Sequence, residues 1–339
     1  MKRNPLPDLL KGFAVFLIIP IHILETFIDY PGRESTIGKV LLFLGGPVAV
    51  PVFMMVMGYF VAVSNKSTRE NIVRGVKIFI LGFLLNIGLN FNLLMKIKFS
   101  GWQIEPLQYI FGVDIFYLAG LSIIILSVIK SLNRGQQWIT FGLILFVSVT
   151  SSYFNNLLLG AKSNYILPFI GGEYSWSYFP IFPWLSYPLI GFLFQKTENP
   201  LLGFFNRKKA VSVVILTVIF INVALFSQFG VETTIALNKY YHHTFLFFLW
   251  VLGVDILWIL LIWYVDRKFS EFPIIVFLKW LGKNITAFYV IQWLIIGNIA
   301  TNIFQTQKLS QFGIWYGAIF LVTLGITLIY ENIRNKYAF

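Results

Sequence analysis

The sequence predicts an all-α, polytopic integral membrane protein with about ten transmembrane helices and with both termini in the cytoplasm. Of its 339 residues, 58% are hydrophobic and only 12% are charged, and the mean hydropathy is +0.77, far above the usual value for soluble domains. Apolar stretches of about 20 residues recur from end to end. Lysine and arginine are unevenly distributed between the loops that connect these stretches.

Each predicted span is an apolar segment bounded by charged or turn-forming residues. The predicted spans are 8–29, 41–64, 72–94, 108–130, 137–158, 179–196, 209–229, 244–265, 274–299 and 311–333. The second is interrupted by the Gly-Gly-Pro sequence at 45–47 and by Pro51, and the sixth contains several prolines. Because no polar block between spans is long enough to fold alone, residues 1–339 are expected to form a single transmembrane domain.

Loop charges predict the orientation of the helices. With these spans, 16 of the 26 Lys and Arg residues lie on the side of the N-terminus and 7 lie on the opposite side. Positive residues concentrate in cytoplasmic loops, so both termini are predicted to be cytoplasmic. The net charge of +12 is mainly this bias, and nucleic acid is therefore not an expected partner. Membrane lipids are the expected surroundings, and a homo-oligomer is compatible with the sequence.

A line of ionisable residues runs along the first predicted helix. At about 100° per residue, Asp8, Lys11, His22, Glu25 and Asp29 fall within an arc of about 100° on one face. A charge inside a bilayer costs at least about 3 kcal/mol, so such a face should meet protein or a water-filled cavity and indicates a functional site.

The outer part of this line, His22 with Glu25 and Asp29, is the predicted catalytic group. Glu25 and Asp29 follow His22 at i+3 and i+7, spacings that place side chains on the same helical face. A carboxylate beside an imidazole orients the ring and fixes its tautomer, as a general base requires. The alternative interpretation is a histidine that only forms a hydrogen bond between helices.

Basic residues at the cytoplasmic ends of the first and third helices are expected to bind the phosphates of a cosubstrate. They are Arg3, Lys11, Arg74 and Lys77. Asp8, beside them, is expected to have an orienting role. Asp255, in the middle of the eighth span, is assigned the same structural or orienting role.

Few other catalytic patterns are present. The chain has no cysteine, which excludes a cysteine nucleophile, and it contains no HExxH, GxSxG or Gly-rich phosphate-binding sequence. His242 and His243 are adjacent where an outer loop meets the eighth span, and adjacent residues on a helix diverge by about 100°, so they form a poor metal site. No metal is expected, and a position on the surface or at the mouth of a substrate site is preferred for this pair.

Several segments together resemble a known superfamily. The opening, RNPLPDLLKGFA followed by apolar residues and His22, resembles the opening of transmembrane acyltransferases related to the acyltransferase-3 type, and PVFMMVMGYFVA resembles their next helix. The bacterial branch of the heparan-α-glucosaminide N-acetyltransferase family is similar to the segments RGVKIFILGFLLN, FGVDIFYLAGL, FPIFPWLSYPLIGFLF and LGKNITAFYVIQ.

The resemblance implies a multi-pass enzyme of the bacterial inner (cytoplasmic) membrane. Such an enzyme takes an acetyl or other acyl group from cytosolic acetyl-CoA, its cosubstrate, and transfers it to the amine or hydroxyl of a sugar on the outer side. By residue match His22 is the histidine of the opening motif. The eukaryotic members have Asn there and carry a histidine in the first lumenal loop, which has none here, so Glu25 or the His242–His243 pair are candidate substitutes.

The acceptor is expected to contact polar or aromatic residues that lie within or beside the spans. They are Asp114, Trp184, His242, His243, Asn284 and Tyr289. His22 either acts as a general base or carries the acetyl group itself. The alternative function is a secondary transporter or lipid-linked glycan flippase that uses the line of ionisable residues as a proton relay. A non-catalytic scaffold is a further alternative that leaves the buried charges unexplained.

Overall fold

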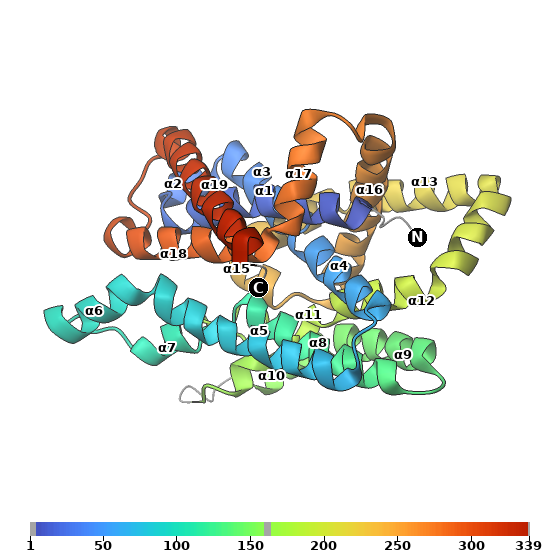
Figure 1. Ribbon diagram of the computed structural model, residues 1–339, viewed down its shortest axis with the longest axis horizontal. Coiled ribbons are helices and arrows are strands. Elements are labelled where there is room, and N and C mark those ends of the chain that lie inside the picture. The colour runs from blue at the N-terminus through green and yellow to red at the C-terminus, as the bar shows by residue number, and fades with distance from the viewer. Residues whose placement is uncertain (1–4, 159–163, 338–339) are drawn as a thin grey trace. The chain divides into compact units, whose positions relative to one another are not determined.

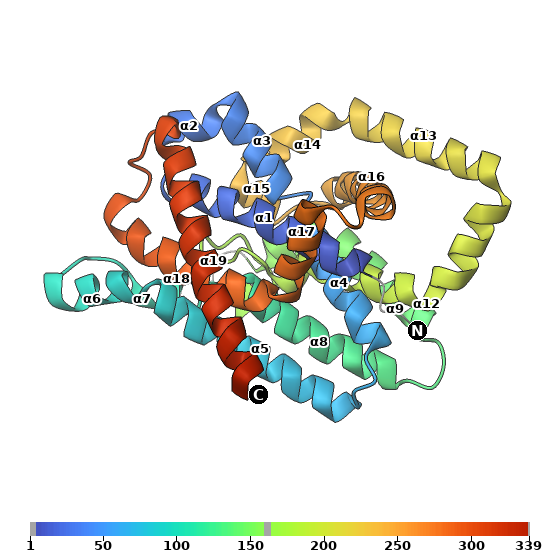
Figure 2. The ribbon, with the colours of Figure 1, turned by 45° about the horizontal axis from the view of Figure 1, so that its top comes forward.

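The protein is built almost entirely from helices (Figures 1 and 2). The structure is a computed structural model, and it describes residues 5–158 and 164–337. Helices account for 82% of the chain, and within the described ranges there is no strand, only two isolated bridges. The all-α prediction is therefore confirmed.

The chain folds into two units, each of which is compact by itself. The first unit comprises residues 1–50, 84–110 and 259–339. Its helices are α1 (Leu6–Thr26), α2 (Tyr30–Glu34), α3 (Thr36–Gly45), α6 (Phe91–Ser100), α7 (Pro106–Ile110), α17 (Pro273–Lys283), α18 (Ile285–Ile303), the 3-10 turn η2 (Leu309–Gln311) and α19 (Phe312–Tyr337).

The second unit comprises residues 51–83 and 111–258. Its helices are α4 (Val50–Val63), α8 (Ile115–Ser131), α9 (Gln136–Val149), α10 (Ser151–Leu157), the 3-10 turn η1 (Leu167–Phe169), α11 (Ile181–Trp184), α12 (Ser186–Arg207), α13 (Lys209–Leu225), α14 (Ser227–Ile235) and α15 (Leu237–Tyr241). Two helices, α5 (Thr68–Leu89) and α16 (Phe245–Phe269), run from one unit into the other.

Helix α1 packs directly against α17, and Figures 1 and 2 show the two side by side. A Cβ atom at Gly12 would lie 1.9 Å from the carbonyl oxygen of Leu278, and one at Gly282 would lie 1.8 Å from that of Asp8. Both distances are far below van der Waals contact, so the two backbones approach as closely as only glycine permits. This crossing fixes the N-terminal half of α1 against α17.

Helix α19 covers α1 with aromatic side chains. The ring of Phe16 makes edge contacts with Tyr316 and Phe320, and the ring of Phe27 makes one with Trp315. Edge-to-face pairs of this kind contribute about 0.5–1.5 kcal/mol beyond the area they bury. They hold α1 along its length against the C-terminal helix.

In the second unit the core is aromatic where α12 meets α16. Trp184, Tyr187, Phe247 and Phe248 are each no more than 1% exposed. Elsewhere in this unit the ammonium of Lys130 donates to the carbonyl oxygens of Val61 and Ser64. Lysine near a helix C-terminus satisfies carbonyl groups that have no partner within the helix, and here it caps α4.

The apolar helices of the structure support a membrane protein, with fewer candidate spans than the ten predicted. Among the described residues, six segments are long and apolar enough to cross a membrane, and up to eight if each sharply bent pair is one span. The second predicted span is interrupted as expected, since α3 ends at Gly45 and α4 begins at Val50. The number ten and the cytoplasmic position of the termini stay predictions.

The helices differ from the predicted spans at their breaks. The predicted span 274–299 is two helices, because α17 ends and α18 begins at Asn284. The predicted span 137–158 is bent by 52° between α9 and α10. The predicted spans 179–196 and 209–229 are joined through a bend of 105° before α13. The fourth predicted span becomes α8, of 17 residues, because Asp114 starts a new helix.

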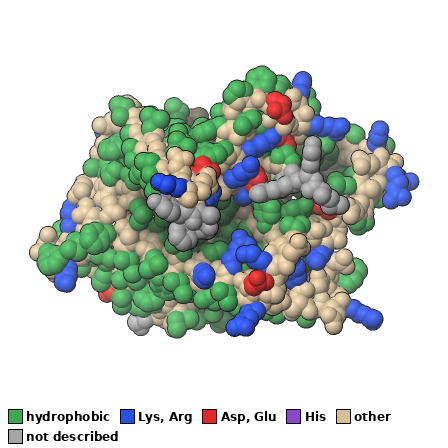
Figure 3. Space-filling view, viewed as in Figure 1, with side chains coloured by type: hydrophobic (Ala, Val, Ile, Leu, Met, Phe, Trp, Pro, Cys, Tyr) green, Lys and Arg blue, Asp and Glu red, His purple; other side chains and the backbone are tan. Residues whose placement is uncertain are grey.

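Large hydrophobic side chains are exposed on many helices. Trp138 on α9 and Ile314 on α19 are 78% and 75% exposed. Hydrophobic side chains also occupy much of the face in view in Figure 3. Soluble monomers rarely expose this much contiguous apolar surface, so these side chains are suited to contact with lipid.

Candidate functional site

His22 lies in α1 and makes a hydrogen bond to Gln292 of α18. Its Nδ1 atom is 3.1 Å from Oε1 of Gln292. The amide nitrogen of Gln292 donates to the backbone oxygen of Tyr289 at 3.2 Å, so Oε1 is the atom that faces the imidazole. An amide oxygen only accepts, and Nδ1 must therefore carry the proton. The lone pair of the neutral ring is then on Nε2, the atom that would act as a base.

Two aromatic rings of α18 contact the imidazole ring of His22. The ring of Trp293 lies 3.9 Å from it between centroids, with 31° between the planes, and the ring of Tyr289 makes an edge contact at 5.9 Å. Tyr289, Gln292 and Trp293 are spaced i, i+3 and i+4, which places them on one face of α18. The orientation of His22 is thus fixed by one turn of a single neighbouring helix.

Glu25 lies one turn beyond His22 on α1 and is half-buried. Its backbone oxygen accepts a hydrogen bond from the side chain of Gln305 at 3.1 Å. The hydrogen-bond partner of His22 Nδ1 is the amide of Gln292, whereas the sequence predicts a carboxylate as the partner of this imidazole. The catalytic role of Glu25 stays a prediction.

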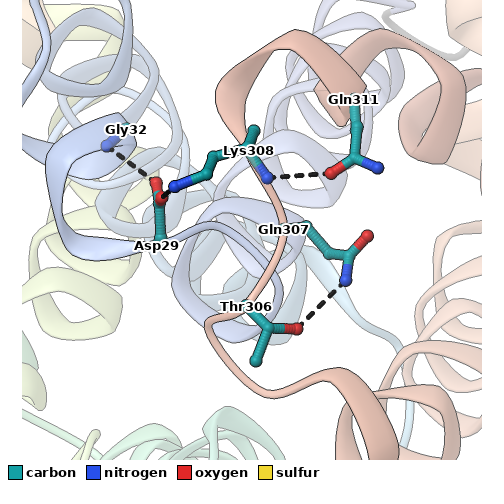
Figure 4. Close-up of polar contacts among 6 residues, drawn as sticks. All are labelled: Asp29, Gly32, Thr306, Gln307, Lys308 and Gln311. Carbon is teal, nitrogen blue, oxygen red and sulfur yellow. Dashed lines mark hydrogen bonds and ion pairs between the residues drawn. The ribbon is translucent and has the colours of Figure 1, made fainter.

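Asp29 begins a short helix and forms an ion pair, as Figure 4 shows. Its carboxylate accepts from the backbone N–H of Gly32 at 3.1 Å and lies 2.8 Å from the ammonium of Lys308. The hydrogen bond from Lys308 holds the pKa of this carboxyl below its usual value. These contacts are structural, and no contact shown here gives Asp29 a part in catalysis.

The backbone on either side of Asp29 is joined to the segment that follows α18. Backbone N–H groups of Gln305 and Gln307 donate to the oxygens of Thr26 and Phe27, both at 2.9 Å, and Asp29 donates to Gln307 at 2.9 Å. The C-terminal end of α1 is therefore tied to the loop between α18 and α19. Together with the hydrogen bond from His22 to Gln292, these backbone bonds join the His22 end of α1 to the C-terminal part of the chain.

At the other end of α1, Asp8 and Lys11 form an ion pair. Their charged atoms are 2.9 Å apart, and Asp8 is 2% exposed. The orienting role of Asp8 stays a prediction. Of the other predicted phosphate contacts, Arg74 and Lys77 lie three residues apart on α5, in the second unit, and Arg3 lies outside the described residues.

The residues predicted to bind the acceptor belong to several different helices and loops. Tyr289 lies beside His22. Asn284, at the junction of α17 and α18, donates to the carboxylate of Glu331 at 3.3 Å, and the indole of Trp280 donates to the same carboxylate at 2.7 Å. Asp114 accepts from the backbone N–H of Ile115 and begins α8. Asn284 and Asp114 therefore have structural partners within the protein.

Trp184, His242 and His243 belong to the buried core of the second unit. The indole of Trp184 donates to the backbone oxygen of Tyr241 at 2.7 Å. Nδ1 of His243 donates to the backbone oxygen of Tyr240 at 2.8 Å, so its Nε2 accepts from the hydroxyl of Tyr187 at 3.0 Å. Burial lowers the pKa of His243 to about 3, and this ring is neutral at pH 7. Its hydrogen bonds are those of a structural core histidine.

Asp255 is buried in α16 without a hydrogen-bond partner in the described part of the chain. The residue is 1% exposed, and neither of its carboxylate oxygens has a hydrogen-bond partner among the described residues. An unsatisfied buried polar group costs about 1–3 kcal/mol. We expect Asp255→Leu to raise the free energy of unfolding by about that amount, seen as a higher thermal midpoint in detergent.

A matched control for this substitution is Asp266→Leu. The carboxylate of Asp266 is 2.7 Å from the ammonium of Lys279, so its loss leaves a half-buried cation without its partner and should lower the midpoint. A lower midpoint for Asp255→Leu as well would contradict the prediction and would show that Asp255 has a stabilising partner.

Comparison with known proteins gives one match. Residues 4–331 match a family model described as an acyltransferase domain, which is nearly the whole chain. Searches of curated proteins and of solved structures return no significant match. The match includes His22 and every α18 residue that contacts its imidazole.

Proposed function

We propose, since this chain belongs to the acyltransferase-3 family of membrane acyltransferases, that it moves an acetyl group from cytosolic acetyl-CoA to a sugar on the outer side of the membrane. The acceptor atom is an amine or hydroxyl of a glucosamine-like sugar or cell-envelope glycan. The observation that carries the proposal is the hydrogen bond between His22 and Gln292, because it leaves a lone pair on Nε2. A transmembrane acyltransferase needs such a base to activate its acceptor.

The length of α1 supports a donor that enters from the cytoplasmic side. Asp8 and His22 are 14 residues apart, which is roughly 20 Å along a helix at about 1.5 Å per residue. In the proposed complex the phosphates of CoA bind basic residues at the Lys11 end, and the extended pantetheine arm brings the thioester to His22. Arg3, Arg74 and Lys77 are the further phosphate contacts in this proposal.

The proposed reaction is a direct transfer. The acceptor N–H or O–H loses its proton to Nε2 of His22 as its heteroatom attacks the thioester carbonyl carbon. The tetrahedral intermediate collapses, the carbon–sulfur bond breaks, and the proton passes from His22 to the sulfur of CoA. The products are the acetylated sugar and free CoA. Gln292 holds the ring in the required tautomer throughout.

The test uses the full chain in proteoliposomes with amino sugars trapped inside and acetyl-CoA, labelled in its acetyl group, added outside. Molecules whose cytoplasmic face points outward should bind the label and deliver acetyl groups to the trapped sugars, whereas empty liposomes should not. If the proteoliposomes took up sugar in response to a proton gradient without CoA, and did not bind acetyl-CoA, the acyltransferase proposal would be wrong and the protein would be a transporter. Binding of acetyl-CoA is measured on the same preparation.

A further inference from the structure

Trp293 is unusual among the tryptophans of this chain because its buried indole N–H has no hydrogen-bond partner among the described residues. Buried indole N–H groups usually donate to an acceptor. Those of Trp184, Trp250, Trp280 and Trp315 do so here. An unsatisfied donor of this kind costs about 1–3 kcal/mol and needs an explanation.

The position of Trp293 provides that explanation. Its ring contacts the imidazole of His22, with 3.9 Å between the ring centroids and 31° between the planes, so the indole that carries the N–H is in direct contact with the proposed catalytic base. Trp176 is the other described tryptophan with an unpartnered buried N–H, but its ring lies against Tyr165 and Tyr174 and not against a histidine. Of these two described tryptophans, only Trp293 has a histidine ring among its ring contacts.

We propose that the indole N–H of Trp293 donates a hydrogen bond to the acyl oxygen of the bound thioester as that oxygen becomes negative. This assignment rests on the proposed acyl transfer. As the acceptor attacks, the carbonyl π electrons move to the oxygen, and the proton of the acceptor moves to Nε2 of His22. When the carbon–sulfur bond breaks, those electrons re-form the carbonyl and the proton leaves with the CoA sulfur. The indole keeps its proton, and its hydrogen bond is strongest in the intermediate.

This role also accounts for the stacking. A donor that stabilises an oxyanion is effective only when it is fixed before the reaction, because it then requires no reorganisation. Gln292, the neighbouring residue, fixes His22 through Nδ1, and Trp293 fixes the same ring by its face. One turn of α18 thus orients the base of α1 and carries the proposed oxyanion donor beside it.

The test is Trp293→Phe, which keeps an aromatic ring against His22 and removes the N–H. We expect kcat to fall by about 10²- to 10³-fold, with KM for acetyl-CoA changed by less than about threefold. The matched control is Trp138→Phe on the exposed face of α9, which should leave kcat unchanged. A purely stacking role would leave kcat within about threefold of wild type in Trp293→Phe, and that result would overturn the proposal.

A second measurement does not depend on turnover. In indole ¹⁵N–¹H spectra of the full chain, the Trp293 signal is the one missing from Trp293→Phe. Its proton should shift downfield when the carba(dethia) analogue of acetyl-CoA, a ketone that cannot transfer its acetyl group, is added. Binding of the analogue without this shift would overturn the role of Trp293 and leave the acyltransferase proposal intact. Absence of both binding and transfer would overturn the acyltransferase proposal itself, and the role of Trp293 with it.

Discussion

Replacing Gly12 by alanine is expected to prevent accumulation of the folded protein. The new methyl carbon would lie 1.9 Å from the backbone oxygen of Leu278, and a backbone oxygen cannot move aside as a flexible side chain can. Helix α17 would have to shift by more than an ångström along the whole crossing. Overpacking of a close contact costs about 1–3 kcal/mol and sometimes more, and a backbone contact belongs at the upper end. Gly282→Ala should have the same effect, since its methyl would lie 1.8 Å from the oxygen of Asp8.

The control for these variants is Gly325→Ala in α19. A Cβ at Gly325 meets nothing within 4 Å. Alanine is favoured over glycine by about 0.5–1 kcal/mol in a helix interior, so this variant should be as stable as wild type or more so. Size-exclusion profiles and thermal midpoints in detergent measure the difference. A Gly12→Ala protein with a wild-type midpoint would show that α1 and α17 do not cross at these glycines.

His22→Ala is expected to reduce acetyl transfer by about 10²- to 10⁴-fold, the usual contribution of a general base. The substitution removes the Nε2 lone pair and should not affect binding of acetyl-CoA, since His22 is not among the proposed phosphate contacts. Initial rates of transfer from labelled acetyl-CoA, together with donor binding, separate the two effects. A residual slow rate is expected, because positioning of donor and acceptor persists without the base.

Thr26→Val is the local control for His22→Ala. Thr26 lies one turn from His22 on α1, and its hydroxyl donates only to the backbone oxygen of His22, at 2.6 Å. Its loss should leave the rate of transfer close to that of wild type. If His22→Ala transferred acetyl groups as fast as Thr26→Val, His22 would not be the base, and Glu25 would be the next residue to replace.

The helical class and most helices could be predicted because they follow from the spacing of apolar residues, which depends on the local sequence alone. The interruption before Val50 was predicted from glycine and proline, whose backbone preferences are also local. The break at Asn284 could not be predicted in this way. No proline marks it, and Asn284 is stabilised there by Glu331, which lies 47 residues away in the sequence. Such a break depends on tertiary contacts.

The candidate site was predicted in part for the same reason. The face of α1 that carries His22 is visible as a helical periodicity, and the family match covers it. Its partners Gln292 and Trp293 could not be assigned to it from the sequence, because neither sequence distance nor charge links α18 to α1. The spacing of Tyr289, Gln292 and Trp293 on one face was the available signal. Asp29 and Asp114 were chosen for their charge, but each begins a helix.

The hydrogen bond between His22 and Gln292 also determines when in the life of the chain the site can exist. The two residues are 270 positions apart. Ribosomes add roughly 5–20 residues per second, so α1 is made roughly 15–50 s before its partner helix. During that interval the imidazole has neither its tautomer fixed nor its aromatic cover. The site is therefore completed only at the end of synthesis, and a nascent chain that stops before α18 can neither hold His22 in place nor protect the polar face of α1 from lipid.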